Sequence, residues 1–219
     1  MKLSKYIDHT NIDEKTTKKD ILKSCQEAKK YNFRGLCVRK EWTKLVKENL
    51  KVSDVKTITL IDPPLGTLPH EKRIEIAKKA KKDGSDEIDV VMNIVDFKKG
   101  NYEKVLNDLK EICKILPTKI IIGSGYLTDE EIKKACEIVK KSGAICIKTA
   151  TEKDPLSTLE LEEKARHIKI MKEFSDGLLV KASGAIRNLR DTIWMIESGA
   201  DIIGTSSGVE IIEEAKKIL

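Results

Sequence analysis

The sequence predicts an α/β fold, a single-domain (β/α)8 barrel that spans residues 1–219. Short apolar runs recur along the chain at a steady interval, as expected for strands that are buried on both faces of a parallel sheet. Helical patterns separate these runs, so strand and helix alternate throughout. No Pro- or Ser-rich segment divides the chain, and eight such units is the number that closes a barrel. An open, doubly wound sheet is the alternative architecture.

Eight apolar runs, several of them rich in β-branched residues, are the predicted strands. A clear example is Thr-Ile-Thr-Leu-Ile at residues 57–61. Of the helices between them, residues 17–31 carry apolar side chains on one face, and residues 128–141 open with the capping box Thr128-x-x-Glu131. The predicted strands, in order, are residues 6–8, 35–38, 57–61, 87–91, 119–122, 144–148, 178–181 and 201–204.

Composition excludes several classes of protein. Hydrophobic residues make up 40% and charged residues 36% of the chain, which is typical of a globular protein and not of a disordered one. The net charge is +6, but Lys and Glu alternate along the polar stretches, and Arg forks and aromatic residues are scarce. Nucleic acid is therefore not an expected partner, although a nucleic-acid binder remains the weakest alternative. No apolar run reaches the roughly 18 residues of a membrane span, and the first residues lack the apolar core of a signal peptide, so we expect a cytoplasmic protein without a membrane partner.

Cysteine, histidine and glycine motifs predict neither a metal nor an organic cofactor. The five cysteines include no C-x-x-C pair, so they are interpreted as small buried thiols. The three histidines are scattered, without the spacing of metal ligands. Residues 123–128 read Gly-Ser-Gly-Tyr-Leu-Thr, an incomplete dinucleotide-binding motif, and no ribose-binding acid follows at the usual distance.

Three charged residues interrupt or end apolar strands: Asp89, Lys148 and Lys181. Alternate strand residues face the inside of a barrel, and this parity places all three side chains inward. Burying such a group is costly unless the charges compensate one another, and active sites of this fold gather at the C-terminal ends of the strands. The alternative interpretation is a structural ion pair, or strand ends that reach solvent.

Two lysines beside an acid are suited to imine chemistry. An ordinary Lys is protonated at neutral pH, but a second ammonium group and partial desolvation favour the neutral amine. Lys148 would then attack an aldehyde or ketone, and the iminium that forms is an electron sink that allows a carbon–carbon bond to break. Residues 204–208, Gly-Thr-Ser-Ser-Gly, run into a helix predicted over residues 209–219, and this helix N-terminus favours a phosphorylated substrate. A simple turn with an N-cap is the alternative for that segment.

Together, these residues resemble the deoxyribose-phosphate aldolase family, a family of class I aldolases built on a (β/α)8 barrel. The resemblance covers nearly the whole chain, through Ile-Asp-His-Thr at 7–10, Leu-Cys-Val at 36–38, Pro-Leu-Gly at 64–66, Asp-Glu-Ile-Asp-Val-Val at 86–91, Leu-Thr-Asp-Glu-Glu at 127–131, Ile-Lys-Thr at 147–149, Val-Lys-Ala-Ser-Gly at 180–184 and the segment at 204–208.

The resemblance implies reversible cleavage of 2-deoxy-D-ribose 5-phosphate to acetaldehyde and D-glyceraldehyde 3-phosphate, without metal or cofactor, by a homodimer or homotetramer. It implies that Lys148 forms the Schiff base, that Lys181 promotes the neutral form of that amine, and that Asp89 takes part in a proton relay. It further implies that Asp8 and Thr10 lie near the relay, that Cys37 lies close to the aldehyde, and that Thr151, Gly184, Ser206 and Ser207 bind the substrate, the last three at its phosphate.

Four positions depart from the family pattern. Glu152 stands where a glycine usually helps to hold the phosphate, and Ala185 replaces a second glycine after Gly184. Arg39 replaces an Asn, and Gly-Ser at 123–124 replaces Glu-Thr. We expect these changes to bear on substrate choice: Glu152 points to solvent, or the pocket takes an unphosphorylated or different aldehyde with Arg39 as a new anion contact. The same residues also fit a lyase for a longer ketose phosphate or a non-catalytic sugar-phosphate-binding barrel.

Overall fold

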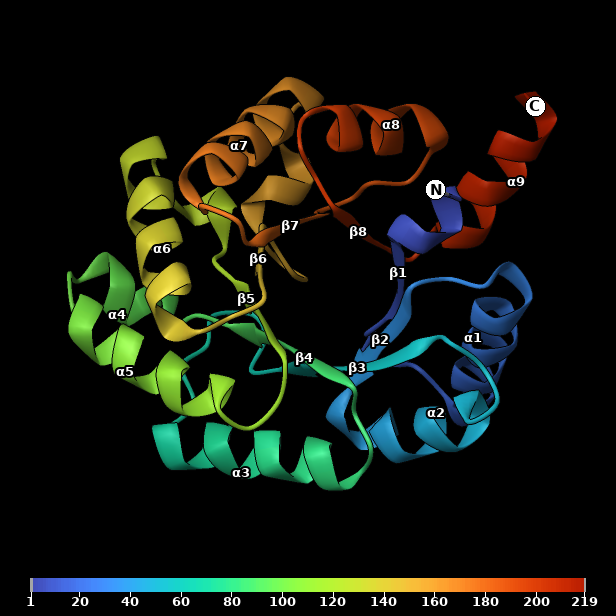
Figure 1. Cartoon of the computed structure of the whole chain (residues 1–219), viewed down its shortest axis with the longest axis horizontal. Coiled ribbons are helices and arrows are strands. Elements are labelled where there is room, and N and C mark those ends of the chain that lie inside the picture. The colour runs from blue at the N-terminus through green and yellow to red at the C-terminus, as the bar shows by residue number, and fades with distance from the viewer. Residues whose placement is uncertain (1, 219) are drawn as a thin grey trace.

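The computed structural model describes residues 2–218 and confirms the predicted architecture. Within these residues, eight parallel strands form one closed barrel in sequence order. Figure 1 shows the strands as a central ring with the helices around it. The open-sheet alternative is wrong because β1 pairs with β8, with Ile7 opposite Ile203 and His9 opposite Thr205. The strands are β1 (Ile7–Asn11), β2 (Gly35–Arg39), β3 (Lys56–Ile61), β4 (Glu87–Val91), β5 (Thr118–Ile121), β6 (Cys146–Lys148), β7 (Leu179–Ser183) and β8 (Ile202–Thr205).

The helices cover the outside of the barrel, and local sequence signals set several of their ends. Thr17 and Thr128 each cap a helix through a reciprocal capping box, as the second of these was predicted to do. The α-helices are α1 (Lys18–Tyr31), α2 (Thr43–Leu50), α3 (His70–Lys82), α4 (Ile94–Lys98), α5 (Tyr102–Cys113), α6 (Asp129–Ser142), α7 (Leu161–Phe174), α8 (Leu189–Glu197) and α9 (Gly208–Ile218), and the short 3-10 helices are η1 (Leu3–Tyr6), η2 (Lys40–Trp42), η3 (Ser124–Tyr126) and η4 (Pro155–Thr158).

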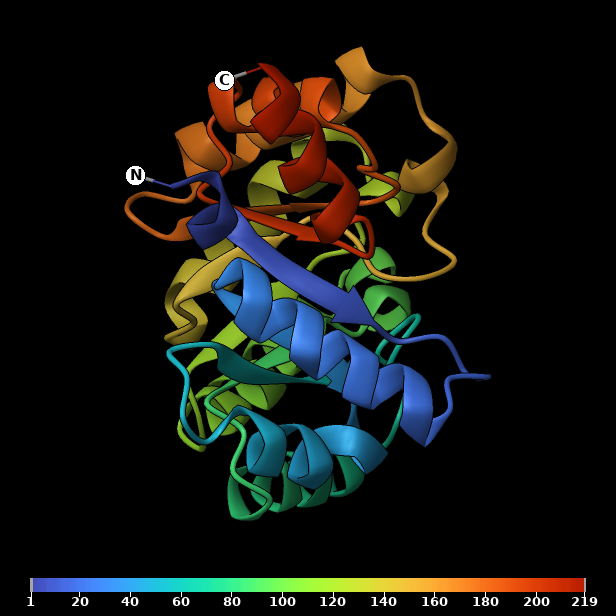
Figure 2. The same ribbon diagram turned by 90° about the vertical axis from the view of Figure 1, so that its right-hand side faces the viewer.

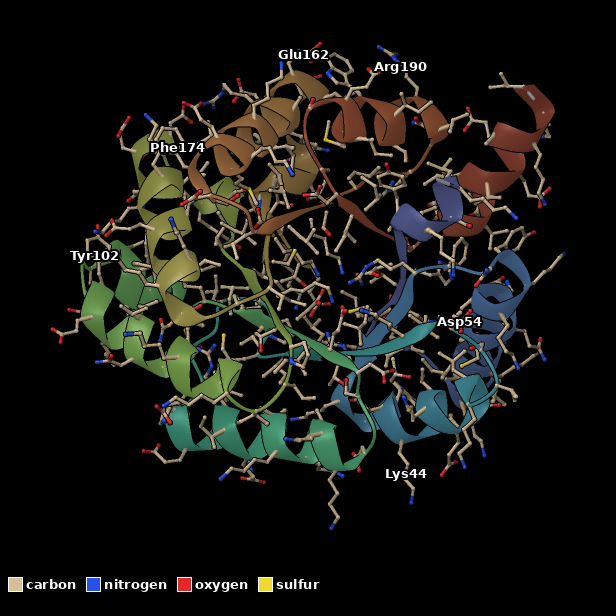
Figure 3. The ribbon with its side chains drawn as sticks, in the orientation of Figure 1. Lys44, Asp54, Tyr102, Glu162, Phe174 and Arg190 are labelled. Atoms are coloured by element: carbon tan, nitrogen blue, oxygen red, sulfur yellow. The ribbon has the colours of Figure 1, made fainter. Side chains whose placement is uncertain are left out.

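The apolar core lies mainly between the strands and the helices. Ile88, Ile120, Ile147 and Val180 on the outer faces of four consecutive strands are all fully buried there. In contrast, Figure 3 shows the side chains of Lys44, Glu162 and Arg190 pointing away from the barrel. Because the helices supply this apolar layer, the inside of the barrel is free to carry polar side chains.

The carboxyl ends of the strands and the loops that follow them form one mouth of the barrel. Figure 2 shows the connection from β1 to α1 and the long connection from β6 to α7 at this same end. Among the helices in residues 2–218, none combines the length and the apolar character that a membrane span requires. Active sites of (β/α)8 barrels lie at this mouth.

Candidate active site

Asp89 is the centre of a buried cluster of charged side chains inside the barrel. Its Oδ2 atom lies 2.8 Å from Nζ of Lys148 and 2.9 Å from Nζ of Lys181. Asp89 and Lys181 are fully buried, and Lys148 is 3% exposed. Strand parity therefore brought together the three residues that the sequence indicated, on β4, β6 and β7. Lys148 and Lys181 are direct neighbours in the register of β6 and β7, so two inward-facing lysines stand side by side there.

Lys119 on β5 is a fourth member that the sequence analysis missed. Its Nζ lies 2.6 Å from Glu87 Oε2, 2.9 Å from Asp89 Oδ1 and 3.7 Å from Asp8 Oδ2, and the side chain is fully buried. It stands opposite Asp89 in the register of β4 and β5. The signal that reveals Lys148, a charge on the inward face of an apolar strand, also applies to Lys119.

Asp8 and Glu87 complete the cluster toward the other end of the barrel. Lys181 Nζ lies 2.6 Å from Asp8 Oδ2. The guanidinium group of Arg34 joins the two acids, at 2.9 Å from Asp8 Oδ1 and 2.8 Å from Glu87 Oε1. Lys56 also contacts Glu87, from a partly exposed position. Asp8 thus lies next to Lys181, and its place near a proton relay stays a prediction.

The cluster holds its acids ionised and Lys181 protonated. Burial by itself would raise the pKa of Asp89, but Lys119, Lys148 and Lys181 together hold that pKa well below its ordinary value. Burial opposes ionisation of Glu87 as well, and Lys119 and Arg34 nevertheless lower the pKa of Glu87 to about 2. Burial would lower the pKa of Lys181, and the adjacent Asp8 and Asp89 raise it instead.

The charges of the cluster do not balance. Within residues 2–218, the carboxylates of Asp8, Glu87 and Asp89 face the cations of Arg34, Lys119, Lys148 and Lys181. Among the buried groups, and apart from the half-exposed Lys56, three negative charges therefore meet four positive ones if every group is ionised. An uncompensated charge is costly in a site of low dielectric, and the cluster balances when one lysine is neutral.

Lys148 is the lysine of this cluster that lines an open cavity. The cavity has a volume of about 850 Å3 and lies at the mouth of the barrel. The predicted substrate-binding residues that line it are Thr10, Thr151, Gly184 and Ser206. Because Arg34, Lys119 and Lys181 do not line it, Lys148 is the member whose amine a substrate can reach.

Three predicted substrate-binding residues do not line the cavity: Asp8, which belongs to the charged cluster, Cys37 and Ser207. Cys37 is buried, with Sγ 3.9 Å from Asp89 Oδ2, and burial together with the charge of Asp89 raises the pKa of its thiol to about 11. Ser207 follows Ser206 in the chain, and its backbone N–H donates to Oγ1 of Thr205 at 2.9 Å. Cys37 and Lys148 thus contact the same carboxylate oxygen of Asp89, and Ser207 supports the wall that Ser206 forms.

The wall between β6, β7 and β8 offers unused polar groups to a ligand. Among the described residues, neither Oγ1 of Thr151 nor Oγ of Ser183 has a hydrogen-bond partner, and both residues line the cavity. The backbone of Gly184 has φ of +118°, a conformation that favours glycine. The N-terminus of α9 follows β8 at this side, and such a terminus attracts anions. Ser183 was not predicted as a site residue, although it belongs to the same segment as Gly184.

Arg39 and Glu152 form an ion pair with each other. Arg39 Nη2 lies 2.5 Å from Glu152 Oε1, and Arg39 Nε donates to the carbonyl of Ile12 at 2.5 Å. Their side chains are 17% and 20% exposed, respectively, so Glu152 does not simply point to solvent. Glu152 instead lines the cavity, and Arg39 is occupied by protein partners.

A (β/α)8 barrel with a buried lysine that lines a cavity at its mouth has the features of a class I aldolase, a carbon–carbon lyase. Two curated proteins support the assignment: the deoxyribose-phosphate aldolase of Mycoplasmopsis pulmonis is 44% identical, with 99% of each chain covered, and that of Thermococcus gammatolerans is 42% identical, with 99% of this chain and 97% of the relative covered. The chain therefore belongs to the deoxyribose-phosphate aldolase family.

Solved structures agree with this assignment. An aldolase named QR15 superimposes with a TM-score of 0.91 at 36% identity, with 98% of this chain and 96% of that chain covered. A deoxyribose-phosphate aldolase from Aeropyrum pernix, described as a unique tetramer, has a TM-score of 0.88 at 26% identity over 99% of this chain and 92% of its own. No family model matches the sequence.

Proposed function

We propose that the protein cleaves 2-deoxy-D-ribose 5-phosphate reversibly to acetaldehyde and D-glyceraldehyde 3-phosphate through an imine on Lys148. The observation that carries this proposal is that the buried cluster holds one more cation than anions, and that Lys148 is its one lysine that lines the cavity. Loss of the proton from Lys148 balances the cluster, and a neutral amine is the nucleophile that attacks an aldehyde.

The same excess charge promotes the bond-breaking step. The amine of Lys148 adds to C1 of the open-chain aldehyde, and loss of water gives a positively charged iminium. A solvent water molecule accepts the proton of the 3-hydroxyl as the C2–C3 electron pair moves into the iminium, which becomes a neutral enamine as glyceraldehyde 3-phosphate leaves. The same water returns a proton to C2 of the enamine, and hydrolysis of the resulting iminium releases acetaldehyde and restores the amine. Because the surroundings already hold as many cations as anions, they favour the neutral enamine over the iminium.

Asp89 and Lys181 support these steps in different ways. Asp89 lies 2.8 Å from Nζ of Lys148 and orients it toward the cavity. Since the pKa of Asp89 is held low and that of Lys181 is raised, both groups stay charged and act mainly as fixed charges around the reacting nitrogen. Thr151, Ser183, Gly184, Ser206 and the N-terminus of α9 would hold the phosphate.

Borohydride trapping tests the proposal. Reduction of the protein with deoxyribose 5-phosphate or acetaldehyde present is expected to give a stable adduct, detected by intact mass and located on Lys148 by peptide mapping. Lys148→Met is expected to abolish the adduct. Lys153→Met removes another lysine of the same cavity and is the matched control, which is expected to keep it. A wild-type protein that forms no adduct with either compound would overturn the proposal.

A second candidate is a Schiff-base aldolase for an unphosphorylated aldehyde, and the observation that favours it is the carboxylate of Glu152 in the cavity wall. Comparing cleavage of deoxyribose with that of its 5-phosphate separates the two candidates, because a strong preference for the phosphate excludes the second. We further propose a homodimer or homotetramer, which light scattering after size-exclusion chromatography would measure. The cytoplasmic location stays a prediction.

A further inference from the structure

The ion pair between Arg39 and Glu152 crosses the mouth of the barrel. Arg39 is the last residue of β2, and Glu152 comes four residues after Lys148 at the end of β6. In the closed order of strands, three strands separate β2 from β6 on either side, so the two residues start from opposite walls. Arg39 has the same strand parity as Cys37, whose side chain faces the inside of the barrel.

Arg39 is firmly held by groups of the protein. Besides Glu152 and the carbonyl of Ile12, its Nη2 atom lies 3.4 Å from Glu14 Oε1. The pair therefore joins three segments: the connection from β1 to α1, the end of β2, and the connection that follows β6. A guanidinium group that donates to a carboxylate and a carbonyl in this way is restricted in position as well as neutralised.

Glu152 would hinder a phosphorylated ligand if it were unpaired. It lines the same cavity as Ser183, Gly184 and Ser206, the residues that offer their polar groups to an anion. A phosphate monoester carries nearly two negative charges at neutral pH, and a carboxylate that shares its cavity repels it. The partner that cancels the charge of Glu152 is Arg39.

We propose that Arg39 is a specificity-determining residue: through its ion pair across the mouth with Glu152, it keeps the cavity able to accept a phosphorylated sugar. This inference rests on the proposed function. Arg39 acts on the substrate through Glu152 and does not itself contact the phosphate. Removal of Arg39 alone leaves the carboxylate of Glu152 without its cation in the cavity, whereas removal of both partners takes that carboxylate away as well.

The test is the ratio of kcat/KM for deoxyribose 5-phosphate to kcat/KM for deoxyribose. Arg39→Met is expected to lower this ratio by at least about tenfold, since repulsion acts only on the phosphorylated substrate. Glu152→Gln is expected to leave the ratio at or above the wild-type value, and the double variant R39M/E152Q is expected to restore it. Arg166→Met, which removes a guanidinium paired with Glu163 on α7, is the matched control and is expected to change nothing.

Two results would overturn the inference: an unchanged ratio in Arg39→Met, or a ratio in the double variant as low as in Arg39→Met, which would make Arg39 a direct phosphate ligand. If Arg39→Met does not fold, as circular dichroism would show, the double variant is compared with the wild type: a ratio at the wild-type value agrees with the inference, and a ratio at least about tenfold lower would make Arg39 a direct phosphate ligand and overturn it. A wild-type protein without a reducible adduct would refute the proposed function instead. Calorimetric titration with inorganic phosphate would then test the inference by itself, with weaker binding expected in Arg39→Met than in the double variant.

Discussion

Replacing Lys119 by Met should slow imine formation without touching the substrate. The variant leaves the three buried carboxylates facing the cations of Arg34, Lys148 and Lys181, so the cation in excess that the proposed mechanism uses is lost. We therefore expect the rate of borohydride trapping at neutral pH to decrease.

The size of the decrease follows from the geometry around Asp89. Lys119 and Lys148 bind different oxygens of this carboxylate, at 2.9 and 2.8 Å. Two cations that share a carboxylate in this way, at a separation on the order of 5 Å, repel each other by ~3 kcal/mol with an effective dielectric constant of about 20. Loss of that repulsion corresponds to a decrease of about a hundredfold in rate. Stability should fall by about 1–3 kcal/mol, because Glu87 loses one buried hydrogen-bond partner but keeps Arg34 and Lys56.

The assay is the rate of borohydride trapping at neutral pH, with kcat/KM for cleavage as a second readout. Lys56→Met is the matched control: Lys56 contacts the same carboxylate of Glu87 from a half-exposed position, where solvent screens its charge, and the variant is expected to keep the wild-type rate. Lys119→Gln, which retains a hydrogen-bond donor for Glu87, serves if the Met variant is too unstable. A trapping rate within about threefold of the wild-type rate, in a folded Lys119 variant, would refute the charge-balance argument.

Two further predictions concern the loop after β6 and the packing around Lys181. Burial raises the pKa of Asp154 to about 6, so the folded protein holds a proton that the unfolded chain releases, and this group makes the protein less stable as the pH rises from about 4 to 6. Asp154→Asn keeps an acceptor for the N–H of Leu156. Its free energy of unfolding, measured with urea, should equal that of the wild type near pH 4 and exceed it by up to about 3 kcal/mol at pH 7. Parallel pH dependences of the two proteins would contradict the raised pKa of Asp154. Gly204→Ala would place a Cβ 2.9 Å from Cε of Lys181 and 2.2 Å from Oγ of Ser183. We therefore expect a loss of about 1–3 kcal/mol in stability and a lower kcat. Full activity would show that Lys181 and Ser183 can move to accommodate the methyl group.

The sequence was sufficient for the barrel and for the centre of the site because both depend on short-range periodicity. Strand parity placed Asp89, Lys148 and Lys181 on inward faces, and a parallel barrel leaves them no other place to meet. Lys119 was missed although the same inward parity applies to it, and its place at the start of a predicted strand does not exclude burial, since Glu87 begins β4 and is buried as well. What local sequence does not specify is the set of partners. Lys119 contacts acids of β1 and β4, and only the folded barrel brings these acids to it.

The ion pair between Arg39 and Glu152 could not be predicted from the sequence, for a different reason. The two residues are 113 positions apart, and each stood in the sequence as a separate departure with its own consequence for the phosphate. Closure of the barrel places β2 opposite β6, so the guanidinium group of Arg39 and the carboxylate of Glu152 neutralise each other across the mouth. Either substitution alone would leave an unpaired charge in or above the cavity, whereas both together leave the net charge there unchanged. The two departures therefore form one compensated pair, and the effect of Glu152 on substrate preference has to be judged together with that of Arg39.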